Sequence, residues 1–185
     1  MRPSSSPIGI LARESLIVLL ALTGAAVAVA AVPDNPEINY AGYRQLVQNT
    51  QSLRAERRLD EADFLAAMRE PGTVLLDARS ADAFALRHLA GAVNLPFTDF
   101  TAERLARILP DRSTRVLIYC NNNFSGSPTA FPTKLPPASL NLSTWSSLRA
   151  YGYDNVYELG PYLDVANTSL PFEGSEVAAA AQASR

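Results

Sequence analysis

Short apolar runs that alternate with helix-like segments constrain the fold of this chain more than any other feature. The runs "VLLDA" (74–78) and "RVLIY" (115–119) are nearly all apolar, which is typical of strands covered on both faces of a parallel sheet. Residues 92–96 and 155–159 predict two further strands. Strands that alternate with helices indicate an α/β domain with a mainly parallel sheet.

Helical segments are predicted before and between these strands. Apolar residues at spacings of three and four predict a helix from Tyr40 onward, and Asp60, Ser80 and Thr101 are N-cap residues for three more. Residues 139–152 predict a last helix, which Gly152 ends. In open α/β sheets ligands bind beyond the carboxyl ends of the strands, so we expect a site there.

The size and charge of the chain exclude several classes of protein. A chain of 185 residues, 48% of them hydrophobic, suits one domain with its own core. The net charge is −2 and the 16 Lys and Arg residues are scattered, so we predict no nucleic-acid partner. The densest basic cluster is "RAERR" (54–58), which we interpret as a solvated helix end.

The N-terminus has the pattern of a targeting segment. Arg2 and Arg13 precede an uncharged apolar run over 15–32, with small residues near Ala30 that suit cleavage. The run is borderline in length for a membrane span, so 1–32 is predicted as a cleaved signal peptide or an uncleaved anchor that attaches the protein to a membrane. Both alternatives place the rest of the chain in the periplasm or cell envelope. Residues 33–58 are predicted as a linker and an N-terminal helix.

The chain has one cysteine, Cys120, and one histidine, His88. This count excludes an internal disulfide, a CxxC redox pair and a Cys/His zinc site built from one chain. We therefore predict no metal and no cofactor.

Cys120 lies where an apolar strand gives way to a polar loop. One interpretation is a buried cysteine that serves as a small hydrophobe. The other is a nucleophile, whose thiolate is stabilised by a nest of backbone N–H groups in the loop, because asparagine and glycine tolerate left-handed backbone. The loop residues in this hypothesis are Asn121, Asn122, Asn123, Phe124, Ser125 and Gly126.

The residues around Cys120 limit the reactions in which its thiol can take part. A Cys–His hydrolase needs His88 beside the thiol, but the place of His88 before a turn is more typical of a structural residue. A cysteine phosphatase needs a cation in the loop, and none is present over 121–133. Sulfur transfer through a cysteine persulfide needs only a thiolate and N–H donors, so it fits best.

Two sequence signatures in this order resemble the rhodanese-like domain family. "VLLDARSADAFALRHLAGAVNLP" resembles the first, with Asp77, Arg79, His88 and Gly91 at its characteristic positions, and "VLIYC" with "YGYDNVYEL" resembles the second half. The chain also resembles an exported bacterial subgroup with an Asn-rich "CNNNF" loop. The resemblance implies a single rhodanese-like domain over 59–172 with a five-stranded sheet flanked by helices. The remaining residues, 173–185, are predicted as a flexible tail.

The same resemblance implies a sulfurtransferase in which Cys120 carries the persulfide, while Asp77, His88 and Gly91 are structural. A small sulfur donor (a persulfide, polysulfide or thiosulfate) and a thiol or other nucleophilic acceptor are the implied partners. The family's active loop is shorter and has Arg or Lys five positions after the cysteine, where this chain has Ser125. Arg79 and Lys134 are therefore the candidate cations, and a persulfide is favoured over thiosulfate. The alternative is a catalytically inactive binding module of the cell envelope.

Overall fold

The computed structural model describes residues 35–183, and those from Glu37 onward form one compact unit. The predicted targeting segment 1–32 lies outside the described residues. Within residues 35–183, no helix is both long enough and apolar enough to cross a membrane.

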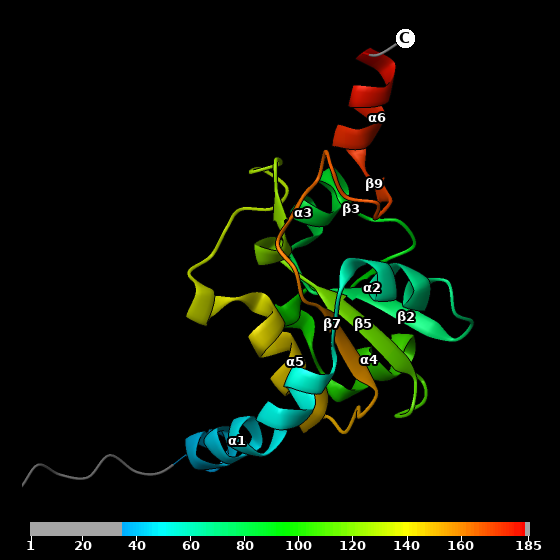
Figure 1. The fold of residues 1–185 in the computed structure, drawn as a ribbon. Coiled ribbons are helices and arrows are strands. Elements are labelled where there is room, and N and C mark those ends of the chain that lie inside the picture. The colour runs from blue at the N-terminus through cyan, green and yellow to red at the C-terminus, as the bar shows by residue number, and fades with distance from the viewer. Residues whose placement is uncertain (1–34, 184–185) are drawn as a thin grey trace, which may run out of the picture. The chain divides into compact units, whose positions relative to one another are not determined.

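A five-stranded, all-parallel sheet in the order β1-β7-β5-β2-β4 forms the centre of this unit (Figure 1). The fold class predicted from the sequence, an α/β domain with a mainly parallel five-stranded sheet flanked by helices, is confirmed. The strands of this sheet are β1 (Arg58–Leu59), β2 (Thr73–Asp77), β4 (Val93–Asn94), β5 (Arg115–Tyr119) and β7 (Val156–Leu159).

Side-chain N-caps start three of the helices at the predicted residues. Asp60, Ser80 and Thr101 each accept a hydrogen bond from a backbone N–H three residues on, and Asn39 caps the first helix in the same way. The helices are α1 (Tyr40–Glu56), α2 (Glu61–Met68), α3 (Ala81–Leu86), α4 (Ala102–Ile108), α5 (Leu140–Ala150) and α6 (Ser175–Ala183).

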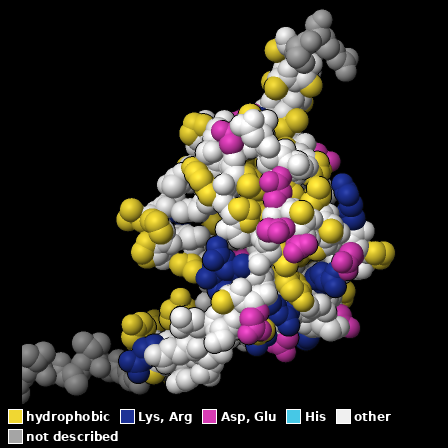
Figure 2. Space-filling model, in the orientation of Figure 1, with side chains coloured by type: hydrophobic (Ala, Val, Ile, Leu, Met, Phe, Trp, Pro, Cys, Tyr) yellow, Lys and Arg dark blue, Asp and Glu magenta, His cyan; other side chains and the backbone are white. Residues whose placement is uncertain are grey.

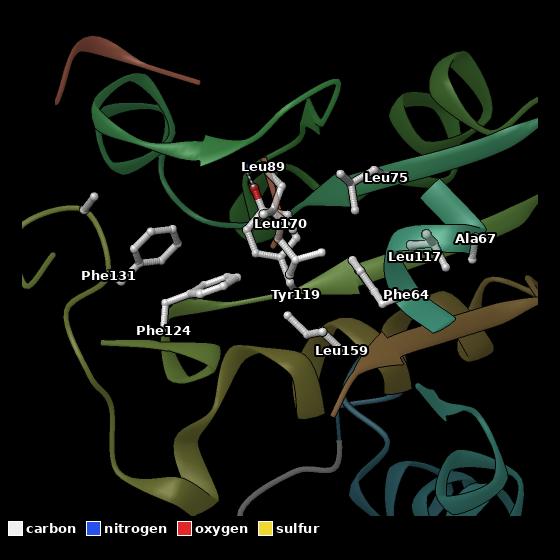
Figure 3. Packing of buried hydrophobic residues seen from close by; sticks show 11 residues of the cluster. Phe64, Ala67, Leu75, Leu89, Leu117, Tyr119, Phe124, Phe131, Leu159 and Leu170 are labelled. Carbon is white, nitrogen blue, oxygen red and sulfur yellow. Dashed lines mark hydrogen bonds between the residues drawn. The ribbon is translucent and has the colours of Figure 1, made fainter. Parts of the chain in front are cut away.

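Alternation along the strands divides the core into two layers, one on each face of the sheet. On one face, Leu117 and Tyr119 of β5 pack with Phe64 of α2 (Figure 3). On the other face, Val116 and Ile118 of β5 pack with α4 and α5, where Trp145 is 1% exposed. By the same period of two, Cys120 and Glu158 belong to the α5 face of the sheet.

The segment after the sheet is more ordered than a flexible tail. Strand β9 (Phe172–Glu173) pairs antiparallel with β3 (His88–Leu89), and α6 follows where the sequence predicts a tail over 173–185. Helix α6 is rich in alanine, the strongest helix former, and its Glu176 accepts a hydrogen bond from Ser127. These contacts tie α6 to the domain.

Candidate active site

A buried polar network lies at the carboxyl ends of the neighbouring strands β2 and β5. Asp77, at the end of β2, forms an ion pair with Arg79 and accepts a hydrogen bond from the Tyr119 hydroxyl at the end of β5. Arg79 also donates to the carbonyl oxygens of Ala130 and Arg87. Asp77 is fully buried and Arg79 is 2% exposed, so the network holds two strand ends and the long loop in fixed positions.

The electrostatics of this network follow from its burial. Burial raises the pKa of Tyr119 well above its usual value, and the nearby charge of Asp77 raises it further. Burial disfavours the charged form of Arg79, but the hydrogen bonds and charge of Asp77 outweigh this and raise the Arg79 pKa. The tyrosine is therefore neutral and the arginine charged at ordinary pH, which matches the hydrogen bonds that they make.

Two other residues of the first signature make local contacts nearby. His88 stacks on Phe84, and its Nδ1 lies 2.7 Å from the Phe84 carbonyl oxygen. Its Nε2 lies 3.5 Å from a carboxylate oxygen of Glu173 in β9. Gly91 has a φ of 78°, in the left-handed region that the turn between β3 and β4 requires. The structure thus places His88 in the β3–β9 pair and Gly91 in the turn that follows β3.

Cys120 follows β5 and is the N-cap of a short 3-10 helix, η2 (Asn121–Asn123). Cys120 is 1% exposed, and the Ser139 hydroxyl oxygen lies 3.4 Å from its Sγ. A hydroxyl at this position can donate a hydrogen bond to a thiolate. The predicted left-handed conformation of the asparagines is wrong, because no residue other than glycine within 35–183 has a positive φ.

The three asparagines of η2 point in different directions. Asn123 turns inward: its Oδ1 accepts from the Cys120 backbone N–H at 2.9 Å, and its Nδ2 donates to the carbonyls of Leu159 and Pro161. Asn122 forms two hydrogen bonds with the backbone of Lys134, across the loop. Asn121 donates to the Pro132 carbonyl. The asparagine side chains therefore hold the loop closed around Cys120.

Residues 124–126, the second half of the predicted loop, pack against other elements of the fold. Phe124 is fully buried and packs edge-on against Phe172 and Tyr119. Phe124 and Ser125 form strand β6, which pairs with β8 (Leu163–Asp164). Gly126 has a φ of 84° and passes so close to Asp164 that a Cβ there meets its carboxylate at 3.1 Å. Position 125, the cation position of shorter loops, thus faces β8.

Cys120 lines a cavity of about 320 Å³ between the sheet, α5 and the end of α1. Asn122, Asn123 and Ser139 share this cavity, as do two arginines, Arg54 and Arg58, and the buried Glu158. The full lining is Arg54, Arg58, Cys120, Asn122, Asn123, Pro136, Ser139, Asn141, Leu142, Glu158, Leu159 and Gly160. In Figure 2, basic side chains gather where α1 meets the rest of the domain.

The two arginines come from the cluster that the sequence suggests is a solvated helix end. Arg54 lies in the last turn of α1, and its Nη2 is 2.7 Å from a carboxylate oxygen of Glu158. Arg58 pairs in register with Glu158 across β1 and β7, and its Nε is 3.1 Å from the same oxygen. Burial raises the pKa of Glu158 above its usual value, although both arginines act to lower it.

The predicted cations Arg79 and Lys134 line a second cavity, of about 500 Å³, together with Asn121. Arg79 faces it from within the buried network, and Lys134 from the exposed loop. The structure therefore does not bring these two cations into the cavity of Cys120. It brings Arg54 and Arg58 there instead, and neither was a candidate from the sequence.

The fold and the site together define an α/β domain with a thiol site, in which a lone cysteine ends the central strand of a parallel sheet and faces a cavity that holds basic side chains. The family model described as the Rhodanese-like domain matches residues 60–160. The chain therefore belongs to the rhodanese-like domain family.

Solved structures with similar folds are distant in sequence. A rhodanese-like domain from Anabaena sp. is 19% identical, with 65% of this chain and 81% of that chain covered at a TM-score of 0.46. A rhodanese from E. coli, solved with anions, is 22% identical, with 56% and 99% covered at 0.38. A protein from Bacillus halodurans is 19% identical, with 69% and 77% covered at 0.42. No curated protein matches the chain in sequence.

Proposed function

We propose that this protein is a sulfurtransferase in which Cys120 carries a sulfane sulfur as a persulfide. The observation that carries the proposal is the cavity in which Cys120 lies with Arg54 and Arg58. Residues 121–133 after the cysteine have no cation, but the end of α1 and strand β1 supply two. The family to which the chain belongs supports the same chemistry.

The reaction proceeds in two balanced displacements at sulfur. The Cys120 thiolate attacks the outer sulfur of a persulfide donor R–S–SH, the donor's S–S bond breaks, and R–S⁻ leaves while Cys120–S–SH forms. An acceptor thiolate then attacks the outer sulfur of Cys120–S–SH. It takes that sulfur, and the Cys120 thiolate leaves unchanged. Neither displacement needs an external oxidant or reductant.

The residues around Cys120 have separate tasks in this scheme. The Ser139 hydroxyl, 3.4 Å from Sγ, can donate to the thiolate and to the bound persulfide. Asn123 holds the backbone of Cys120, and so fixes the direction in which the thiol faces. Because Cys120 is 1% exposed, a donor must enter the cavity to reach its thiol, which limits contact with bulk water.

A two-step transfer experiment tests this function. The protein is incubated with a small organic persulfide, separated from the donor by desalting, and then mixed with a fresh thiol. We expect the thiol to receive about one sulfane sulfur per chain, because a single cysteine can hold one persulfide. If the desalted protein delivers no sulfur, the domain is a non-catalytic binding module and the proposal is wrong.

We also propose that the domain acts outside the cytoplasm, on the basis of the targeting pattern over residues 1–32. Fractionation of cells that express the full chain checks this. The domain is expected in the periplasmic or membrane fraction, and recovery from the cytoplasm alone contradicts it.

A further inference from the structure

The cavity of Cys120 has an excess of positive charge that comes from outside the region matched by the family model. Among its lining residues Arg54 and Arg58 are cationic and Glu158 is anionic, so one positive charge remains while the Cys120 thiol is neutral, and this charge offsets that of the Cys120 thiolate. The family model matches residues 60–160, and both arginines precede that range. The charge is thus a property of α1 and β1 in this chain.

Glu158 holds the two guanidinium groups in place at the cavity. Its side chain is 1% exposed, whereas those of Arg54 and Arg58 are 29% and 51% exposed. Arg58 is fixed further by a 3.0 Å hydrogen bond from its Nη2 to the Gly160 carbonyl. The carboxylate therefore lies behind the arginines, and their exposed parts are available to a ligand. A guanidinium fixed in this way binds a carboxylate with little loss of side-chain entropy.

The charge and the size of the cavity together indicate the kind of ligand. With the Cys120 thiolate counted, a ligand with one carboxylate leaves the cavity with one net negative charge, whereas a dianion such as thiosulfate leaves it with two. A volume of about 320 Å³ lies within the range of cavities that bind small organic molecules. Leu142, Leu159 and Pro136 in the lining provide apolar contact for a carbon skeleton.

We infer that the site takes a small organic persulfide that carries one carboxylate, with the carboxylate bound by Arg54 and Arg58 and the persulfide directed at Cys120. This inference rests on the proposed function, because it names the substrate class of the same site. It makes α1 and β1 the elements that select the substrate.

A matched pair of donors tests the inference. The persulfide of N-acetylcysteine has one carboxylate, and the persulfide of N-acetylcysteine amide has the same skeleton without that charge. For the wild-type protein, we expect the carboxylate donor to persulfidate Cys120 about tenfold faster than the amide, as a partly exposed charge-assisted hydrogen bond allows.

Two variants test whether Arg58 causes the difference between the rates of the two donors. Arg58→Gln is expected to lower the ratio of the two rates at least about threefold, because one of the two guanidinium groups is lost. Arg44→Gln removes the same charge from an exposed position on α1 and should leave the ratio unchanged. A variant that folds poorly lowers both rates together, so the ratio isolates recognition of the carboxylate.

The outcomes distinguish a failure of this inference from a failure of the proposed function on which it rests. Equal rates for the two donors in the wild-type protein, or an unchanged ratio in Arg58→Gln, overturn the inference while sulfur transfer stands. If neither donor persulfidates Cys120, the proposed function fails and the inference falls with it. A ratio near ten that drops in Arg58→Gln alone supports both.

Discussion

Replacement of Arg79 by methionine is expected to lower the free energy of unfolding by about 3–5 kcal/mol. The substitution keeps most of the side-chain volume but leaves the fully buried Asp77 carboxylate without its ion-pair partner. It also removes the donors to the carbonyls of Ala130 and Arg87, which join the long loop to the turn before β3. Denaturant unfolding measures the loss.

An exposed ion pair provides the matched control for this variant. Arg104 pairs with Asp99, and their side chains are 53% and 39% exposed, so Arg104→Met is expected to cost less than about 1 kcal/mol. Similar losses for Arg79→Met and Arg104→Met contradict the role given to the buried network. A large loss for Arg79→Met alone is the expected result.

Cys120→Ser is expected to abolish sulfur uptake and transfer completely, because a serine hydroxyl forms no persulfide. The chain has no second cysteine, so the variant has no other thiol to take over. The serine differs from cysteine by one atom at a buried position, so the fold should persist, as thermal unfolding can check. Sulfur transfer by a folded Cys120→Ser variant at the wild-type level contradicts the assignment of the nucleophile.

The sheet and its helices could be predicted because their signals are local. The runs at β2 and β5 are apolar enough to be buried on both faces, and three of the helices begin at the N-cap residues that the sequence predicts. Strand β1 has two residues and carries no such pattern, so its position at the sheet edge follows only from its pairing with β7.

The cations of the site could not be predicted from the sequence, because their positions depend on contacts between distant residues. Arg54 and Glu158 are 104 residues apart, and nothing in "RAERR" differs from a solvated helix end until Glu158 lies beside it. A glutamate in the short strand segment "VYEL" was a local signal, since a charge in a buried strand requires a partner.

The asparagines of the loop illustrate a second limit. Three successive asparagines after a strand predict a turn, but their sequence does not show which side chain turns inward. In the structure Asn123 donates to the carbonyls of Leu159, at the end of β7, and Pro161, and it accepts from Cys120, whereas Asn122 faces Lys134. The segments that provide these partners, 159–161 and 134, come close only in the folded chain.

The most direct test of the central claim is the mass of the Cys120 peptide after the protein has reacted with a small organic persulfide. The wild-type protein is treated, freed of donor, digested without reductant and analysed by mass spectrometry. If Cys120 carries the sulfur, its peptide gains the mass of one sulfur atom, and a fresh thiol removes it. An unmodified Cys120 peptide from folded protein, with the donor still intact, contradicts the claim.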